Sequence, residues 1–151
     1  DQGKQISDVE LLSMASEVLG DKGIKRIVQL IGFSVSTGIG TMPYAFVKLN
    51  IDGKEFSGTD HGVGPVDASL NAIQKITGKI SEIRIKDYAL ASISGGSTAL
   101  CEVTISVEDG HGNRVSAKSV GEDIVTTSVQ AVIDGINHIM LKKMLKEKQV
   151  S

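Results

Sequence analysis

The feature that most constrains this chain of 151 residues is an internal repeat. Matching apolar and glycine positions recur 56 residues apart: Gly40 with Gly96, Val47 with Val103, Leu49 with Ile105, and Ile51 with Val107. Two further pairs recur 57 residues apart, Asp52-Gly53 with Asp109-Gly110 and Gly64 with Gly121. A single inserted residue accounts for the change in spacing. The chain is therefore expected to be built twice from one unit, and the two units bury their apolar faces against each other.

The first unit is predicted to begin with three strands. Residues 27–38 are rich in β-branched side chains, and residues 44–51 alternate apolar with polar side chains, as a strand with one buried face does. Asp52-Gly53 predicts a tight type I′ turn, because both of its central positions need positive φ. Residues 54–62 form the third strand.

A helix follows in the stretch HGVGPVDASLNAI, residues 61–73. Gly64 can serve as its N-cap and Pro65 as its first residue, and Gly78 is expected to end it. The first N–H groups of such a helix have no intrahelical partner, which favours a carboxylate ligand. An ordinary turn from a strand into a helix explains the same residues.

The second unit repeats this order. Strands are predicted over residues 82–93, 99–107 and 114–120, and a helix with one apolar stripe opens at Gly121. The fold class is thus α+β, a pseudo-twofold duplication of a β-β-β-α unit. Residues 7–20 have apolar positions at helical spacing and predict a short helical linker. The expected boundaries are 1–24 for the linker and 25–151 for the domain, with units 25–78 and 79–151.

Composition narrows the classes of partner. A net charge of -2 provides no chain-wide positive field for nucleic acid or anionic lipid. No uninterrupted apolar run approaches a membrane span, and the first eight residues do not resemble a signal peptide. We therefore expect a cytoplasmic protein that binds neither nucleic acid nor membrane. The chain begins at Asp1 without methionine, which indicates a piece of a longer protein.

Side chains for catalysis or metal binding are sparse. His61, His111 and His138 lack the close spacing of metal ligands, so neither a metal site nor a cofactor site is expected in this chain. Cys101 is the only cysteine and fits a core thiol in a reducing compartment. A small enzyme that uses Cys101 or His61 stays open as a rival hypothesis, because catalytic partners need to be near only in space.

The two helix starts point to an amino-acid ligand. Each follows a glycine and carries acids, Asp67 in the first and Glu122 and Asp123 in the second. Backbone N–H groups suit the carboxylate of an amino acid, and an aspartate suits its ammonium. The same acids also stabilise their own helix dipoles, and composition does not separate these readings.

The GVGPVDA motif, the duplicated order and the second helix together resemble the C-terminal regulatory domain of the 2-isopropylmalate synthase and citramalate synthase family. This resemblance covers residues 27–145, and residues 5–20 are similar to the helical linker ahead of that domain. It implies a homodimer that binds leucine, or isoleucine in a citramalate synthase, as feedback inhibitor. It also implies a parent protein whose TIM barrel uses a divalent metal to condense acetyl-CoA with a 2-oxo acid, 2-oxoisovalerate in the leucine pathway.

The resemblance also implies an effector site, carried over by motif. Its residues here are Gly64, Pro65, Val66, Asp67, Ile85, Tyr88, Ile93, Thr98, Val103, Gly121, Asp123 and Ile124. The choice between leucine and isoleucine stays open, because one methyl position in an apolar pocket is worth only about 1 to 3 kcal/mol. A dimerisation module without a ligand is the remaining alternative.

Overall fold

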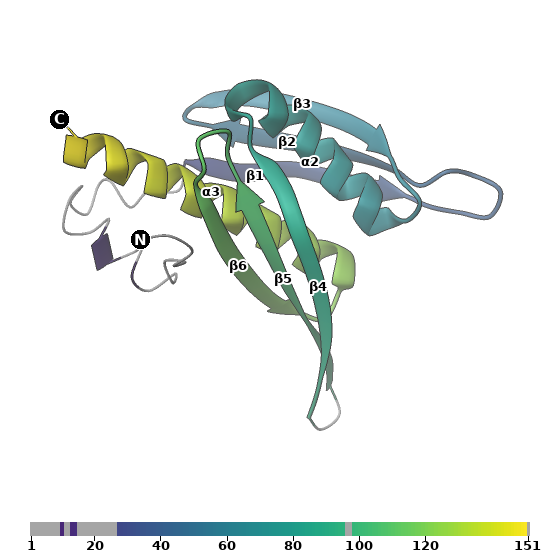
Figure 1. Ribbon diagram of the computed structural model, residues 1–151. Coiled ribbons are helices and arrows are strands. Elements are labelled where there is room, and N and C mark those ends of the chain that lie inside the picture. The colour runs from purple at the N-terminus through teal and green to yellow at the C-terminus, as the bar shows by residue number, and fades with distance from the viewer. Residues whose placement is uncertain (1–9, 11–12, 15–26, 96–97, 151) are drawn as a thin grey trace.

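The computed structural model describes residues 10, 13–14, 27–95 and 98–150 (Figure 1). The elements are β1 (Val28–Ser36), β2 (Tyr44–Ile51), β3 (Lys54–His61), α2 (Pro65–Ser81), β4 (Arg84–Gly95), β5 (Thr98–Glu108), β6 (Arg114–Gly121) and α3 (Ile124–Val150). This order confirms the predicted α+β duplication. The helical linker predicted over residues 1–24 lies outside the described residues, except for Glu10, Ser13 and Met14, which are helical.

Each unit forms its own antiparallel sheet, in the order β1-β2-β3 and β4-β5-β6. Helix α2 packs on β2 and β3, α3 packs on β5 and β6, and the two helices contact each other (Figure 1). The alternation predicted for the central strands explains this, because every second side chain is buried. These side chains are Val47, Leu49 and Ile51 on β2 and Val103, Ile105 and Val107 on β5. The two units therefore share one core.

Each helix carries one side-chain amide that binds the backbone at the first strand of the other unit. On α3, Asn137 Oδ1 accepts a hydrogen bond from Val28 N (2.8 Å), and Asn137 Nδ2 donates one to Val28 O (2.9 Å). On α2, Gln74 Oε1 accepts from Ile85 N (2.8 Å), and Gln74 Nε2 donates to Ile83 O. Val28 and Ile85 stand at corresponding positions in their sheets. The units are thus fastened to each other reciprocally.

The two hairpin turns differ more than the sequence comparison predicted. Asp52 and Gly53 have φ of 51° and 89°, which confirms a two-residue turn with positive φ at both positions. The second turn is longer and covers residues 109–113. Gly58 and Ser119, which face corresponding residues of the central strands, are consequently 61 positions apart. The prediction of a single inserted residue was wrong for two reasons. The second turn is longer, and the strands of the second hairpin form one more residue pair before the turn, Glu108 with Arg114.

The end of α2 also lies beyond its predicted place. The helix passes through Gly78 to Ser81 and is capped by Glu82, whose φ of 53° is left-handed. One glycine inside a helix costs only about 1 kcal/mol. Packing offsets that cost here, since Ile76 and Ile83 on either side of Gly78 are buried in the shared core.

Helix α3 is the longest element and the main core helix of the second unit. Residues 124–147 are long and apolar enough, by length and composition, to cross a membrane. Most of this stretch is buried inside the protein, where it packs on β5, β6, α2 and β1. Its apolar character is therefore accounted for by the fold.

Candidate functional site

Hydrogen bonds within residues 61–68 hold the start of the first helix. Gly64 is the N-cap and Pro65 the first helical residue, as predicted. The Asp67 carboxylate turns back and accepts a hydrogen bond from Val63 N at 2.9 Å through Oδ2. Asp67 therefore fixes the loop ahead of its own helix.

The glycine that this start requires is Gly62, which the sequence reasoning missed. A Cβ on Gly62 would lie 2.4 Å from Ala68 N, whereas a Cβ on Gly64 would meet nothing within 4 Å. The φ of Gly64 is -152°, which any residue adopts. The end of β3 thus presses directly on the first turn of α2. The sequence signal that could have identified Gly62 is its position, immediately after a strand and two residues before the N-cap.

An open cavity of about 600 Å³ lies beside this start. Its residues are Gly40, Thr41, Met42, Pro43, His61, Gly62, Val63 and Asp67. Two of its apolar side chains are strongly exposed, Met42 at 66% and Val63 at 96%. The cavity therefore offers apolar contact and one carboxylate together, which suits the side chain and the ammonium of an amino acid.

The second helix start, residues 120–127, is capped by Asp123. Asp123 Oδ2 accepts a hydrogen bond from Thr126 N (2.7 Å), and Asp123 O accepts one from Thr127 N (2.9 Å). Hydrogen bonds from the side chain and then the backbone of Thr126 hold the pKa of Asp123 below its ordinary value. The helix itself begins at Ile124.

Gly121 does not open this helix, so its predicted pairing with the N-cap of α2 was wrong. It ends β6, where a Cβ would lie 2.4 Å from Thr127 Oγ1. Gly62 and Gly121 are 59 residues apart, and so are Pro65 and Ile124, the first residues of the two helices. Gly121 is thus the counterpart of Gly62, because both let a strand end approach a helix closely.

Two of the expected site residues on the second sheet lie on the face that α3 covers. Tyr88 Oη and Ser128 Oγ are 2.7 Å apart, which joins β4 to the beginning of α3. Val103 is fully buried and pairs with Leu90, two residues from Tyr88 on the same face. Ile93 is three residues from Leu90 and therefore belongs to the opposite face.

The twelve expected residues thus fall into separate groups. Gly64, Pro65, Val66 and Asp67 form the first helix start, and Tyr88, Val103, Gly121, Asp123 and Ile124 lie around the second. Figure 1 shows both helices beginning on the right-hand side of the molecule. Ile85 is near the other end of β4, where Gln74 binds its N–H, and Thr98 begins β5.

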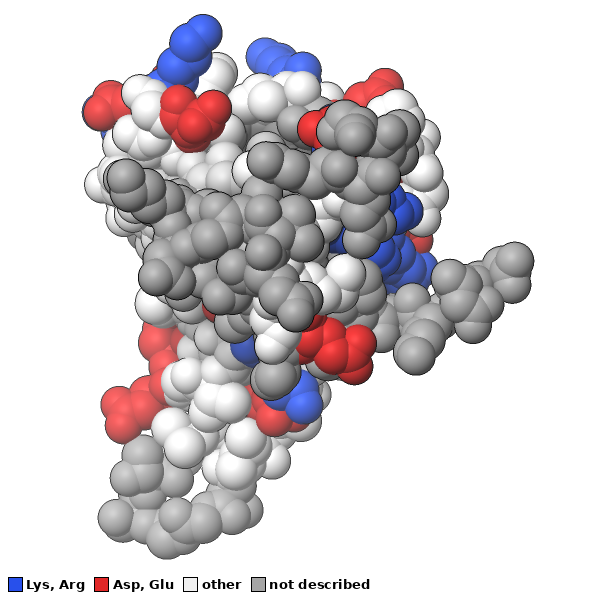
Figure 2. All heavy atoms as spheres, turned by 90° about the vertical axis from the view of Figure 1, so that its left-hand side faces the viewer, with Lys and Arg blue, Asp and Glu red and all other residues white. Residues whose placement is uncertain are grey.

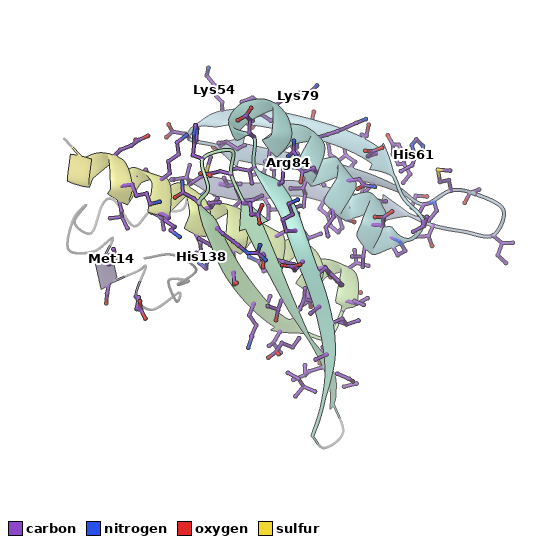
Figure 3. The ribbon with its side chains drawn as sticks, viewed as in Figure 1. Met14, Lys54, His61, Lys79, Arg84 and His138 are labelled. Carbon is purple, nitrogen blue, oxygen red and sulfur yellow. The ribbon has the colours of Figure 1, made fainter. Side chains whose placement is uncertain are left out.

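Two of the three histidines lie far apart in the part of the chain that the structure describes. Figure 3 shows His61 beside the start of α2, on the opposite side of the view from His138 on α3. His61 stacks edge-on against Tyr44, with ring centroids 5.2 Å apart. Among the residues that the structure describes, no group of three or more His, Cys, Asp or Glu could hold a metal ion. On the face seen in Figure 2, acidic and basic side chains are interspersed, which does not favour a polyanion there.

Comparisons with known proteins agree with this fold. A family model described as the LeuA allosteric (dimerisation) domain matches residues 5–140. The chain is 41% identical over 144 residues to a 2-isopropylmalate synthase of Methanocaldococcus jannaschii, covering 95% of this chain and 27% of the relative. It is 40% identical to a probable 2-isopropylmalate synthase of Methanosarcina mazei, covering 94% and 28%. An (R)-citramalate synthase of Methanocaldococcus jannaschii is 37% identical, covering 93% and 28%. The chain spans less than a third of the length of these relatives.

Proposed function

This chain belongs to the LeuA allosteric (dimerisation) domain family, and we propose that it senses leucine for a 2-isopropylmalate synthase. In this proposal leucine binds at the helix starts and inhibits the parent enzyme, which condenses acetyl-CoA with 2-oxoisovalerate. The condensation, and the divalent metal that it uses, belong to the part of the parent protein outside this chain. The relative that is an (R)-citramalate synthase supports a second candidate, in which the effector is isoleucine.

The observation that carries the proposal is the cavity at the first helix start. The isobutyl group of leucine would contact Met42 and Val63, and its ammonium would face the Asp67 carboxylate. Among the residues that the structure describes, the hydrogen bond to Asp67 uses only Oδ2, so Oδ1 can face a ligand. The start of α2 favours the leucine carboxylate through its dipole.

Titration calorimetry combined with NMR tests this proposal. The chain has four methionines, so methyl labelling of methionine provides few and separable signals. We expect leucine to bind with measurable heat and to shift the Met42 methyl signal, with isoleucine binding more weakly. The absence of heat with both amino acids at millimolar concentration would contradict the proposal, and isoleucine binding more tightly would support the citramalate alternative.

Asp67→Asn is the matched variant, because an asparagine oxygen can still accept the bond from Val63 N while the charge is lost. Loss of the charged partner of the ammonium is expected to weaken leucine about tenfold. 4-Methylpentanoate, which is leucine without its ammonium, should be insensitive to this change. An unchanged dissociation constant for leucine would leave Asp67 with only its role in the loop.

Homodimerisation is the second part of the proposal. Ile93 and Val120 lie on the face of the second sheet that α3 does not cover, and they are 38% and 50% exposed. Such apolar side chains on a sheet face favour a second copy as partner. Equilibrium sedimentation should show a dimer that Val120→Glu weakens and that Lys79→Glu, on α2, leaves intact. A dimer of unchanged strength in Val120→Glu would place the contact elsewhere.

A further inference from the structure

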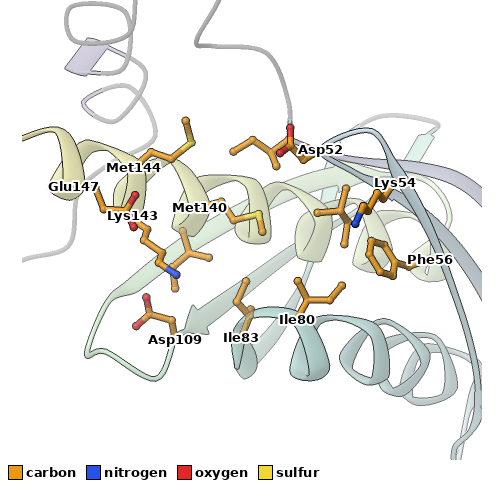
Figure 4. Close-up of a pocket in the computed structure, with 13 residues that line it drawn as sticks. Asp52, Lys54, Phe56, Ile80, Ile83, Asp109, Met140, Lys143, Met144 and Glu147 are labelled. Carbon is orange, nitrogen blue, oxygen red and sulfur yellow. The ribbon is translucent and has the colours of Figure 1, made fainter.

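The cavities at the two ends of α2 differ in the charges that line them. The cavity between the β2–β3 hairpin, the end of α2 and α3 has three carboxylates, Asp52, Asp109 and Glu147, and its two lysines stand on opposite sides (Figure 4). Such mixed charges favour no single ligand. The cavity at the first helix start is simpler. Among the residues that the structure describes, His61 is its only base and Asp67 its only acid.

One base and one acid in the same cavity match the two charges of an amino acid. The carboxylate and the ammonium of an amino acid sit on the same carbon, so their two partners must lie close together. Asp67 Oδ2 lies 2.9 Å from Val63 N, and Val63 is only two residues beyond His61. The Asp67 carboxylate therefore lies close to the segment that carries His61.

Hydrogen bonds hold the backbone of His61 in place. Asn71, one helical turn beyond Asp67 on α2, donates from Nδ2 to His61 O at 3.0 Å. The N–H of His61 donates to Asp60 Oδ1 at 2.8 Å. Both backbone polar groups of His61 are thus occupied, and α2 holds the segment through Asp67 and Asn71 together.

The ring of His61 is oriented as well. Tyr44 is its cross-strand partner on β2, and the two rings meet edge-on, with centroids 5.2 Å apart and planes at 64°. Edge-on ring pairs are favourable, so this contact limits the rotation of the side chain. Neither imidazole nitrogen takes part in a hydrogen bond with the described residues. The imidazole is therefore held beside the cavity with its nitrogen atoms available to a ligand.

We propose that the His61 imidazole, in its protonated form, binds the carboxylate of the effector amino acid while Asp67 binds its ammonium. The inference rests on the proposed function, because the ligand is the leucine of that proposal. It gives the carboxylate a charged partner in addition to the dipole of α2. It also makes effector affinity depend on pH, since histidine ordinarily titrates near about pH 6.5.

The other charged and titratable groups around His61 do not change in that range. On β3, Asp60 binds the N–H of His61 and lies 3.9 Å from Lys75 Nζ of α2. Asp67 is in the first turn of α2, and Tyr44 is on β2. Aspartate, lysine and tyrosine ordinarily keep one charge state between about pH 5.5 and about pH 8. A change in leucine affinity over this range therefore reports on His61.

Leucine titrations of the methionine-labelled chain, read at the Met42 methyl signal from about pH 5.5 to about pH 8, test the inference. Because His61 is exposed, we expect the gain of a surface ion pair, about fourfold tighter binding at the acid end. 4-Methylpentanoate should gain in the same way, whereas 3-methylbutan-1-amine, which is leucine without its carboxylate, should not gain. Equal affinity of leucine at both ends of the range would overturn the inference and leave the proposed function standing. Absence of leucine binding at every pH would overturn both.

His61→Phe is the matched variant, because it keeps a ring against Tyr44 and has no titrating nitrogen. It should weaken leucine about fourfold at about pH 5.5, remove the pH dependence and leave 3-methylbutan-1-amine unchanged. His61→Lys keeps a positive charge throughout and should bind leucine at about pH 8 as tightly as the unmodified chain does in acid. His111→Gln, which lies outside this cavity, is the control and should change neither the affinity nor its pH dependence. A pH dependence that persisted in His61→Phe would assign it to another group and contradict the inference.

Discussion

The two units follow one plan but bring helix and sheet together in opposite ways. In the first unit the small residue is on the strand: a Cβ on Gly58 would lie 3.0 Å from Ile76 Cγ1 of α2. In the second unit it is on the helix: a Cβ on Gly135 of α3 would lie 2.6 Å from Ile105 Cδ1 and 2.8 Å from Val107 Cγ2. The repeat therefore preserves a close approach between layers, and either layer can supply the space for it.

The largest expected effect compares the glycines that end the third strands. In Gly62→Ala the new Cβ meets backbone atoms of α2, which cannot rotate away, and we expect a loss of about 4 kcal/mol in the free energy of unfolding. In Gly121→Ala the nearest atom is Thr127 Oγ1, at the end of a side chain that can rotate, and we expect about 2 kcal/mol. Denaturant unfolding at fixed protein concentration measures both.

Two controls make this comparison sharp. Gly64→Ala should cost no more than about 1 kcal/mol, the ordinary difference between glycine and alanine at an N-cap, since nothing lies within 4 Å of the new Cβ. Adding Thr127→Ala should rescue Gly121→Ala, because it removes the contacted hydroxyl. If Gly62→Ala proved as mild as Gly64→Ala, the close approach would not be a requirement of the first unit.

The next largest effect concerns the two amides that fasten the units. Asn137 is 4% exposed and satisfies both backbone groups of the fully buried Val28, so Asn137→Ala should cost about 3 kcal/mol. Gln74 is half-buried, and Gln74→Ala should cost about 1 kcal/mol, because its two hydrogen bonds are only part-buried and Ile83 O keeps a donor in Thr77 Oγ1. Urea unfolding of both single variants checks the order. Equal costs would mean that the fastening is symmetric.

Local signals explain why the order of elements and the first hairpin could be predicted. Alternation in residues 44–51 and the Asp52-Gly53 pair each determine a conformation within a few residues. The same reasoning located the N-cap of α2 at Gly64, because proline after glycine is itself a local signal.

The features that the sequence did not reveal depend on contacts between distant residues. Asn137 and Val28 are 109 positions apart, and no local pattern marks their hydrogen bonds. Gly121 is needed because it lies close to Thr127 across a strand–helix junction. The sequence does not show this contact, and the prediction that Gly121 opens the helix was therefore wrong. The effector site stays a prediction, because the structure gathers nine of its twelve residues at two helix starts and leaves Ile85, Ile93 and Thr98 elsewhere.

The smallest expected effect compares the two caps. Asp123 caps α3 with its side chain, whereas Gly64 caps α2 without a side-chain bond. Asp123→Ala should therefore cost about 1 kcal/mol near neutral pH, and Gly64→Asp should gain a few tenths of a kcal/mol, about 0.3. Unfolding curves of the single variants measure both differences.

The cap of α3 should also depend on pH. Hydrogen bonds from Thr126 lower the pKa of Asp123 in the folded state below its ordinary 3.8, so the unfolded state binds the proton more readily. The stabilisation is present above about pH 4 and is lost as the pH falls through the folded pKa. The difference in free energy of unfolding between the unmodified chain and Asp123→Ala should accordingly shrink in acid. Asp123→Asn keeps a capping oxygen but has no titrating charge. The difference in free energy of unfolding between Asp123→Asn and Asp123→Ala should therefore not change with pH. A gap between the unmodified chain and Asp123→Ala that stayed constant down to pH 2 would mean that the carboxylate charge does not contribute to the cap.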